Sequence, residues 1–256
     1  MDLGLKGRKA IVTGGSRGIG RAIAECLANE GCDVGICARG ADGVKATVEA
    51  LKKKGVNAAG EAVDISKGDE IRRWVANMDR ALGGFDIYVS NVSALSIATS
   101  DEAGWRTALD TDIMGTVNGV EAALPVIERS SDAGSVIFIA TTGAVQVYGP
   151  RKPYPSVKSA ILAYMKHLSH DVAKKGIRAN AVSPGSIYFE GGVWDQRKKN
   201  EPERYERMLK ANPLGRFGRP EEIGAAVAFL ASPAVSGWTS GTNIVIDGGS
   251  TVRIQN

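Results

Sequence analysis

Cysteine is scarce in this sequence, and its scarcity excludes two kinds of site. The 256 residues include three cysteines, Cys26, Cys32 and Cys37, and none of them forms a CxxC pair. An odd number argues against a disulfide framework, and the missing pairs argue against a metal or redox site. We therefore expect buried thiols in a reducing compartment.

Long apolar runs are absent as well. No stretch of eighteen apolar residues occurs, so the sequence predicts no membrane-spanning helix. Residues 1–6 lack the charged and then apolar pattern of a secretory signal. These features predict a cytoplasmic protein without a membrane partner.

The chain also lacks a concentration of charge of one sign. The net charge is +4, and the cations are dispersed: residues 52–54 end a predicted helix, and residues 197–199 lie among acids. Nucleic-acid binding needs a continuous basic face. We therefore expect no nucleic-acid partner.

Glycine, in contrast, is abundant, with 32 residues, nearly twice the usual share of about 7%. Many of the glycines end short apolar runs, and these runs alternate with helical patterns. The predicted strands are residues 10–12, 33–38, 58–63, 85–89, 135–140, 178–183 and 243–246. The predicted helices are residues 21–30, 44–54, 66–82, 101–128, 154–175 and 221–231. Ser66 is expected to cap its helix, and Pro125 to disturb the end of its own.

This alternation predicts one α/β domain over residues 1–256, with a doubly wound parallel sheet covered by helices on both faces. Ligands bind beyond the carboxyl ends of such strands. The sequence places residues 13–20, Asn91, Thr141 and residues 184–185 at that edge, which predicts one shared site.

A glycine-rich turn follows the first predicted strand. Gly14, Gly18 and Gly20 would let the backbone approach a pyrophosphate at a helix N-terminus. Their spacing, GxxxGxG, differs from the general dinucleotide pattern GxGxxG. The glycines alone are equally consistent with a tight turn that binds nothing.

Tyr154 and Lys158 stand four residues apart and share one helix face. There the ammonium can stabilise a phenolate and lower the pKa of the tyrosine from about 10 toward working pH. A chance pairing on an amphipathic helix is the alternative. The glycine turn upstream favours hydride transfer with proton exchange at a carbonyl or an alcohol.

Taken together, the motifs resemble those of the short-chain dehydrogenase/reductase family. The resemblance covers essentially the whole chain and rests on Thr13-Gly14-x-x-x-Gly18-x-Gly20, Tyr154-x-x-x-Lys158, Pro184-Gly185, and Ser240-Gly241 with Asp247-Gly248-Gly249. It implies a Rossmann-like single domain, a nicotinamide cofactor and a homo-oligomer, a tetramer or a dimer. It also implies that cofactor binding lies in about residues 1–150 and catalysis with a substrate lid in about 151–256.

The resemblance also implies catalytic roles. Tyr154 would act as general acid/base, with Lys158 lowering its pKa and binding the nicotinamide ribose. Thr141 stands thirteen residues before the tyrosine, where the family has serine, and is favoured over Thr142 to polarise the substrate oxygen. Asp112 aligns with the asparagine that supports the family's proton relay.

The end of the second predicted strand bears on the choice of dinucleotide. An NAD site needs a carboxylate there, whereas this chain has none and carries Arg39 just past the strand and Arg17 in the turn. Two solvated arginines are the alternative to an NADP site. With the resemblance, the expected cofactor contacts are Gly14, Ser16, Arg17, Gly18, Ile19, Gly20, Arg39, Asp64, Ile65, Asn91, Tyr154, Lys158, Pro184, Gly185 and Ile187.

Four further positions depart from the family. Val92 and Ser93 replace smaller residues after the fourth strand, Asp112 could bond Lys158, and Phe189 replaces a threonine that holds the carboxamide. Ser186 is a candidate substitute for that threonine. These departures leave the turnover rate and the substrate open.

Residues 185–212 interrupt the strand and helix rhythm where the family has its substrate lid. The aromatic lid predicts a bulky apolar or acyl substrate, and packing of the lid itself or a subunit contact is the alternative. The expected substrate contacts are Thr141, Tyr154, Tyr188, Phe189 and Trp194. His167 and His170 have metal-site spacing but no third ligand in the sequence, so no metal is expected.

The sequence thus predicts an NADP(H)-dependent oxidoreductase that interconverts a carbonyl and a secondary alcohol on a small molecule. The alternative is a cofactor-binding protein with little catalysis, which acts as a redox sensor or an assembly partner.

Overall fold

A parallel sheet forms the centre of the computed structural model, which describes residues 2–95, 99–130, 133–147 and 151–253. Within these residues the seven strands lie in the order β3-β2-β1-β4-β5-β6-β7. Their bounds are β1 (Lys9–Thr13), β2 (Asp33–Ala38), β3 (Ala58–Ala62), β4 (Ile87–Ser90), β5 (Ser135–Ile139), β6 (Arg178–Pro184) and β7 (Asn243–Ile246). The order reverses between β1 and β4, where a doubly wound sheet opens a crevice for ligands. The predicted Rossmann-like fold is confirmed.

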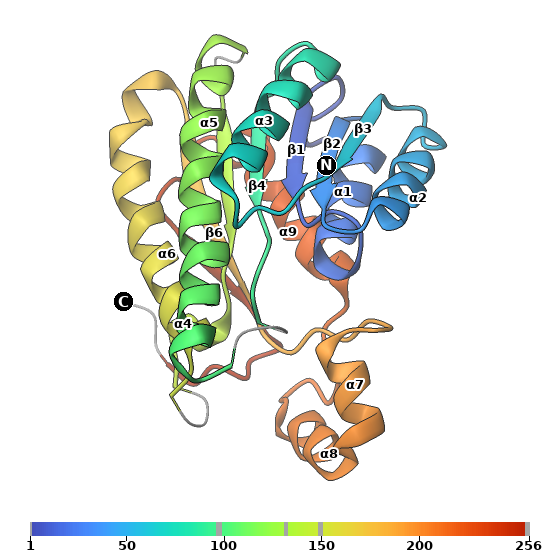
Figure 1. The fold of residues 1–256 in the computed structure, drawn as a ribbon, viewed down its shortest axis with the longest axis vertical. Helices are drawn as coiled ribbons and strands as arrows, with labels where there is room; N and C mark the ends of the chain where they lie inside the picture. The colour runs from blue at the N-terminus through green and yellow to red at the C-terminus, as the bar shows by residue number, and fades with distance from the viewer. Residues whose placement is uncertain (1, 96–98, 131–132, 148–150, 254–256) are drawn as a thin grey trace.

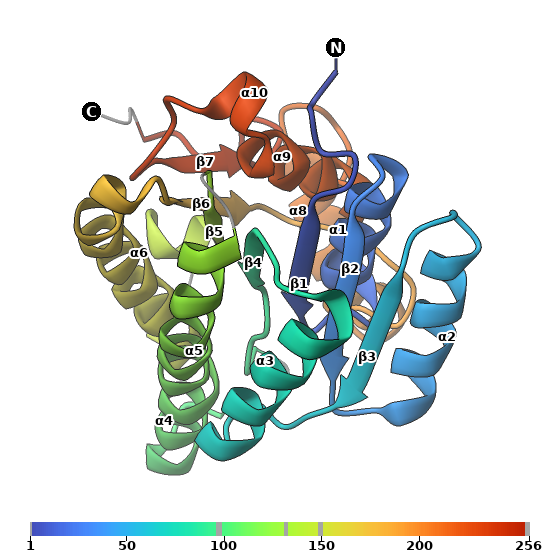
Figure 2. The same cartoon turned by 90° about the horizontal axis from the view of Figure 1, so that it is seen from above.

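Helices cover both faces of the sheet (Figures 1 and 2). Their bounds are α1 (Gly18–Asn29), α2 (Ala41–Lys52), α3 (Gly68–Leu82), α4 (Glu102–Ala108), α5 (Gly115–Ser130), α6 (Pro153–Asp171), α7 (Val193–Asn200), α8 (Pro202–Ala211), α9 (Pro220–Ala231) and α10 (Pro233–Ser236). Helices α1, α2 and α9 pack on one face, and α3, α5 and α6 on the other. Because both faces are covered, the strands are apolar on both sides.

Ser66 does not cap α3, contrary to expectation. The helix begins at Gly68, with Lys67 at the N-cap and no side-chain cap. The Ser66 hydroxyl instead donates to the Asp64 carboxylate at 2.7 Å, and the Ser66 N–H donates to it at 3.1 Å. The carboxylate is the stronger local acceptor, so the serine closes the turn that follows β3.

The long predicted helix over residues 101–128 is divided, but not at Pro125. That proline lies inside α5, which continues to Ser130. The hydrogen bond it removes would reach the carbonyl of Glu121, an exposed residue whose carbonyl can turn to water. The division comes earlier, at a π-helical segment, Leu109–Met114, between α4 and α5. Such segments are rare and occur mostly at functional sites, and this one carries Asp112.

Two helices stand apart from the sheet. Residues 185–212 contain α7 and α8, which project from the body beyond the carboxyl ends of the strands (Figure 1, lower right). We call residues 185–212 the lid.

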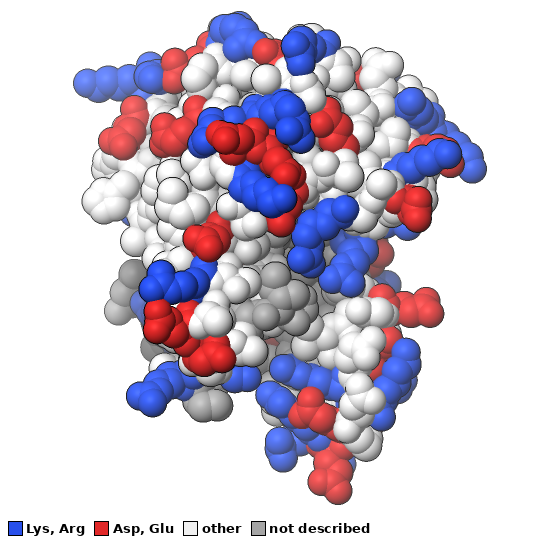
Figure 3. Space-filling model, in the orientation of Figure 1, with Lys and Arg blue, Asp and Glu red and all other residues white. Residues whose placement is uncertain are grey.

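The described surface shows no broad basic area on the side drawn in Figure 3, where cations and acids are interspersed. In the described segments, no helix has both the length and the apolar character needed to cross a membrane.

Candidate active site

The turn between β1 and α1 presents a helix N-terminus at the switch point of the sheet. Helix α1 begins at Gly18, and the N-cap residue, Arg17, supplies no side-chain hydrogen bond. Backbone N–H groups of the first turn therefore lack a capping side chain, as an anion-binding helix start requires.

Gly14 and Gly20 serve the packing of this turn. A Cβ on Gly20 would lie 2.2 Å from the carbonyl oxygen of Gly14, and one on Gly14 would lie 2.9 Å from Asn91 Nδ2. Asn91 follows β4 and donates to the carbonyl oxygens of Thr13 at 2.9 Å and of Gly14 at 3.4 Å. Two of the three motif glycines and Asn91 thus hold the turn in shape across the switch point.

Gly18 instead faces the lid. A Cβ on Gly18 would lie 2.5 Å from the ring of Phe189, and one on Gly192 would lie 2.9 Å from the same ring. The Phe189 ring therefore rests between two glycines, directly over the start of α1. The sequence placed Phe189 with the substrate, whereas the structure places it against the glycine turn.

Cations gather where β2 ends. Arg17 and Arg39 are exposed, and neither forms an ion pair with another described residue. Ser16 lies beside the first turn of α2, since a Cβ on Gly43 would lie 3.3 Å from the Cβ of Ser16. This corner offers two free guanidinium groups, a hydroxyl and a second helix start.

Asp64 and Ile65 follow β3 at the same edge. Burial opposes the charge of Asp64, but hydrogen bonds from Ser66 and the nearby cations Lys67 and Arg39 hold the pKa of the carboxyl below its usual value. Ile65 is buried against Gly115. Asp64 is therefore an ionised acceptor next to the arginine corner.

The phenol of Tyr154 lies among polar groups from three segments. Tyr154 is in the first turn of α6, is half-buried, and is hydrogen-bonded to the side chains of Thr141 and Ser93. Burial and the charge of Asp112 raise the pKa of Tyr154 to about 12, while the two hydroxyls act in the opposite direction. Thr142 is 6% exposed beneath this corner. Of the two threonines that the sequence offered, Thr141 is the one bonded to the phenol.

Lys158 is paired with Asp112 beneath the phenol. The Nζ of Lys158 lies 3.0 Å from Asp112 Oδ1 and donates to the carbonyl oxygen of Val92 at 3.2 Å. The other carboxylate oxygen, Oδ2, accepts the N–H of Ala94 at 2.9 Å. The side chains are 3% and 0% exposed, so the pair is removed from water.

Ser93 is a site residue that the sequence reasoning missed. It registered there only as a bulkier replacement after the fourth strand, although its hydroxyl bonds the phenol of Tyr154. The available signal was a hydroxyl at the carboxyl edge of the sheet, two residues after Asn91.

The aromatic side chains of the lid pack against other lid side chains and against Phe217, which follows the lid in the sequence. Trp194 stacks on Phe217 with ring centroids 4.7 Å apart, and the guanidinium of Arg197 lies 4.6 Å from the Trp194 ring. The Tyr188 hydroxyl donates to Asp195 at 3.0 Å. Tyr188 and Trp194, expected at the substrate, are therefore engaged in packing the lid.

Residues 184–187 end β6 and begin the lid, and hydrogen bonds and packing hold them against the body of the protein. The Gly185 N–H donates to the carbonyl oxygen of Ile246 at 2.9 Å, and a Cβ on Gly185 would lie 2.5 Å from Asp247. The Ile187 side chain is buried, and the following N–H, of Tyr188, donates to Gly218 at 2.9 Å. The end of β6 is therefore fixed just before the lid begins.

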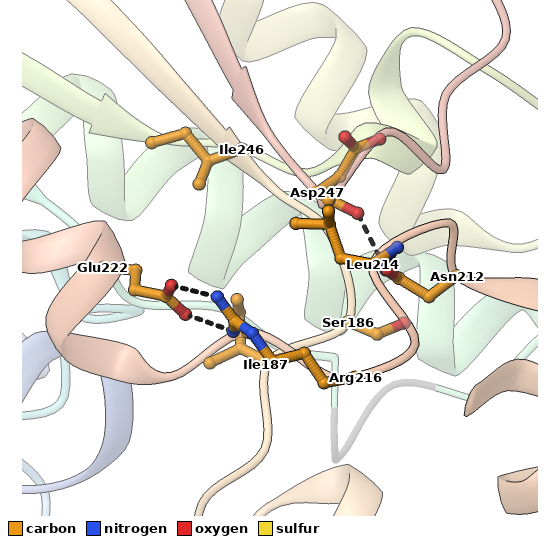
Figure 4. Close-up of a pocket in the computed structure, with 10 residues that line it drawn as sticks. Ser186, Ile187, Asn212, Leu214, Arg216, Glu222, Ile246 and Asp247 are labelled. Atoms are coloured by element: carbon orange, nitrogen blue, oxygen red, sulfur yellow. Dashed lines mark hydrogen bonds and ion pairs between the residues drawn. The ribbon is translucent and has the colours of Figure 1, made fainter. Parts of the chain in front are cut away.

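Behind this segment lies a cavity of about 120 Å³ (Figure 4). Ser186 and Ile187 form one side, and Asn212 donates to the Asp247 carbonyl at 2.9 Å on another. The cation in its wall, Arg216, is neutralised by Glu222 through two contacts of 2.6 and 2.9 Å. The remaining charged group of the lining, Asp247, accepts the N–H groups of Gly249 at 3.0 Å and Thr251 at 2.7 Å, so the charged groups that line the cavity already have partners within the chain.

His167 and His170 lie on α6. Within the part of the chain that the structure describes, no three His, Cys, Asp or Glu side chains gather closely enough to hold a metal ion.

Comparison with known proteins places this geometry in a family. A family described as "Enoyl-(Acyl carrier protein) reductase" matches residues 14–251. The chain is 35% identical to Isoepoxydon dehydrogenase patN of Penicillium expansum, covering 100% of this chain and 99% of that protein. It is 31% identical to 3-oxoacyl-[acyl-carrier-protein] reductase FabG of Staphylococcus epidermidis, and the match covers 94% of this chain and 98% of that protein.

Solved structures agree. L-sorbose reductase from Gluconobacter frateurii, complexed with NADPH and L-sorbose, matches with a TM-score of 0.91 and 29% identity over 99% of this chain and 100% of that one. A short-chain type dehydrogenase/reductase from Mycobacterium marinum matches with a TM-score of 0.85 and 29% identity over 98% of each chain. The chain is a member of the short-chain dehydrogenase/reductase family of oxidoreductases.

Proposed function

We propose that this protein is an NADP(H)-dependent oxidoreductase that interconverts a carbonyl and a secondary alcohol. One observation carries the proposal: the Tyr154 phenol is hydrogen-bonded to Thr141 and is acted on by the charge of Asp112, which forms a buried pair with Lys158. The relatives with similar sequences bear the names of a dehydrogenase and a reductase, which fits this reaction class.

The chain's own groups would handle the oxygen and its proton. Tyr154 donates its phenolic proton to the carbonyl oxygen in reduction and accepts it back from the alcohol in oxidation. Thr141 carries a second hydroxyl bonded to that phenol, so one substrate oxygen can lie within reach of both. A bound nicotinamide dinucleotide would supply or accept the hydride at the carbon atom.

The residues present fit a dinucleotide. The uncapped start of α1 suits a pyrophosphate, and the unpaired Arg17 and Arg39 with Ser16 suit a 2′-phosphate. No carboxylate stands at the end of β2 to hold the ribose hydroxyls of NAD. These features support NADP(H) over NAD(H), with Phe189 moving aside to clear the glycine turn.

For the substrate we propose a carbonyl compound and the corresponding secondary alcohol. The expectation of a bulky apolar or acyl substrate rested on aromatic lid side chains, and two of these, Tyr188 and Trp194, contact other lid groups. The size of the substrate is therefore a question for a substrate panel.

We also propose a cytoplasmic homo-oligomer, a tetramer or a dimer. Large apolar side chains are exposed along α4 and the segment before α5, where Trp105, Leu109 and Met114 are 37%, 46% and 46% exposed. Exposed apolar surface of this kind marks contact sites between proteins. Light scattering of the purified chain gives its mass in solution, and a monomer at micromolar concentration would contradict the proposal.

The deciding experiment is oxidation of NADPH, with NADH in parallel, across ketones from small aliphatic and polyhydroxylated ones to β-ketoacyl thioesters. We expect turnover with NADPH to exceed turnover with NADH at least tenfold. Replacing Arg17 and Arg39 by alanine is expected to reduce that ratio, because each removes a phosphate partner. Equal use of both dinucleotides would contradict the NADP assignment.

The second candidate, a cofactor-binding sensor with little catalysis, is favoured by the Phe189 ring over Gly18. Tight binding of NADPH without turnover of any ketone in the panel supports that function over the first.

A further inference from the structure

Asp112 is the buried ion-pair partner of Lys158, and its charge also acts on the phenol of Tyr154. It is fully buried and holds the ammonium of Lys158 at 3.0 Å. The carboxylate accepts the Ala94 N–H through its other oxygen at 2.9 Å. Oδ2 is thus hydrogen-bonded to the backbone, while the buried Oδ1 has no hydrogen-bond partner among the described residues and is compensated by the ammonium of Lys158 alone.

Neither ion of the Lys158–Asp112 pair is stable in this buried site without the other. Removing one ion from a buried pair leaves an uncompensated charge, which costs several kcal/mol. Lys158 and Asp112 therefore present a neutral unit to their surroundings, rather than the lone cation that Tyr154 and Lys158 by themselves would provide.

The charged and polar groups that face the phenol of Tyr154 come from four segments of the chain. Lys158 lies on the same helix, and Asp112 comes from the π-helical segment. The segment after β4 contributes the hydroxyl of Ser93, and the segment after β5 contributes that of Thr141. The two hydroxyls do not titrate in the accessible pH range, so the local charge comes from Lys158 and Asp112.

A lone ammonium near a phenol stabilises the phenolate, whereas a carboxylate bound to that ammonium cancels much of its field. Burial and Asp112 accordingly raise the pKa of Tyr154. The positive charge of an oxidised nicotinamide would arise only after hydride transfer in reduction and would be present from the start in oxidation. It would act equally on the wild type and the variants, so it does not change which charges the folded chain supplies.

We propose that Asp112 is a positioning residue that neutralises Lys158 and keeps Tyr154 protonated, which suits the site to carbonyl reduction at neutral pH. This inference rests on the proposed function. In reduction a bound reduced dinucleotide would supply a hydride with its two electrons to the carbonyl carbon, and Tyr154 would give its phenolic proton to the carbonyl oxygen. The resulting phenolate regains a proton from water. Alcohol oxidation needs the phenolate from the start, so it becomes efficient only at higher pH.

The first test is the pH dependence of kcat/KM in both directions for the wild type and Asp112→Asn. Reduction loses activity above the pKa of the phenol, and oxidation gains activity up to it. With Asp112 neutral, we expect both limbs to move to lower pH by about one unit or more. A lower rate with unmoved limbs would overturn the proposal, since a merely structural role predicts that result.

The matched control is Asp86→Asn. Asp86 also pairs with a cation, Arg8 at 3.2 Å, but it precedes β4 at the opposite edge of the sheet. We expect it to leave both pH limbs where they are. Movement of the limbs in this control equal to that in Asp112→Asn would assign the shift to general loosening and overturn the proposal.

A double variant separates charge from shape. In Asp112→Asn with Lys158→Met both charges are gone, so the phenol should titrate again near the wild-type position. If the double variant stays as displaced as Asp112→Asn alone, shape and not charge is responsible. This variant also serves if the single one folds poorly, because it buries no lone charge.

The last readout needs no turnover. Phenolate absorbance is followed against pH in the folded protein, and the same titration of Tyr154→Phe is subtracted to isolate Tyr154. We expect Asp112→Asn to ionise Tyr154 at lower pH than the wild type. If no ketone is reduced by the wild type, the proposed function fails, while this titration still decides whether Asp112 controls the phenol. An unchanged difference curve would overturn the inference by itself.

Discussion

Two aspartate–lysine pairs, one in the body and one in the lid, show what burial does to the same chemistry. In the lid, Asp195 and Lys199 lie 2.8 Å apart on one helix, and the lysine side chain is 62% exposed. In the body, Asp112 and Lys158 lie 3.0 Å apart on separate elements, and neither side chain is more than 3% exposed.

The two pairs have different consequences because water screens only one of them. A pair with an exposed lysine contributes little to stability, while a buried pair is costly to break and sets the charge felt by its neighbours. The lid is held to the body by ring contacts such as Trp194 stacked on Phe217, which follows the lid. The catalytic corner, by which we mean Tyr154, Thr141, Lys158 and Asp112, is held by charge and hydroxyl hydrogen bonds. We therefore expect the corner to respond sharply to single substitutions and the lid to respond weakly.

Breaking the buried pair has the largest expected effect. Lys158→Met leaves Asp112 as a lone buried charge, which should lower the free energy of unfolding by about 3–5 kcal/mol. The matched lid variant, Lys199→Met, should change it far less. Urea denaturation measures both, and similar losses in the two variants would remove the distinction between the pairs.

Removing one hydroxyl from each region comes next. Tyr154→Phe removes the proposed acid and should lower kcat about 10²–10⁴-fold while NADPH binding persists. Tyr188→Phe removes the hydroxyl that donates to Asp195 in the lid and should change kcat by only a few fold. Steady-state kinetics with NADPH fluorescence titration measures both. An active Tyr154→Phe protein would contradict the proposed mechanism.

The contact between the two regions can be loosened at Phe189. Its ring lies over Gly18, so Phe189→Thr should free the start of α1. We expect NADPH to bind several fold more tightly, a gain smaller than the tenfold change that corresponds to about 1.4 kcal/mol. Phe189→Leu keeps an apolar side chain there and serves as the control. Calorimetric titration gives the dissociation constants, and weaker binding in the threonine variant would show that the ring supports the dinucleotide.

The smallest expected effect concerns the lid and arises when Asp195 is protonated in acid. Hydrogen bonds from Lys199, the Gly191 N–H and Tyr188 lower the pKa of Asp195 to about 2. The carboxyl binds its proton less readily in the folded lid than in an unfolded chain, where its pKa is about 3.9. The stabilisation is therefore complete above about pH 4 and is lost as the pH falls toward about 2.

Trp194 fluorescence, with the signal of Trp194→Phe subtracted, should report this change, and Asp195→Asn should reproduce it at neutral pH. A lid transition near neutral pH instead would show that another group controls the lid. The phenol of Tyr154 should not titrate over the acid range, because burial and Asp112 raise its pKa to about 12.

Much of the fold could be predicted because a parallel sheet covered on both faces demands apolar strands separated by helices. The predicted strand over residues 33–38 and the observed β2 coincide, and the lid lies where the rhythm stopped. The errors were local. Ser66 found Asp64 as a partner in place of the helix N-terminus, and Pro125 was tolerated where its lost hydrogen bond faces water.

The site was predictable only in part. Residue types and motif spacing singled out Tyr154, Lys158 and Thr141, and the structure brings the phenol, the pair and the threonine together. Ser93 was missed because its role depends on where the chain runs after β4, which no spacing encodes. Phe189 was assigned to the substrate because the sequence gives the composition of the lid but not the direction of its side chains.

The sequence by itself determined the fold class, the edge of the sheet where ligands bind and the identity of the acid/base candidate, since these follow from patterns local in the chain. Only the tertiary structure decided that Asp112 lies 3.0 Å from Lys158 and that Phe189 rests on Gly18. Both contacts join segments far apart in the sequence, and their effect depends on exclusion of water, which is a property of the packed molecule. The charge presented to Tyr154 is therefore set by folding and not by the Tyr154-x-x-x-Lys158 motif alone.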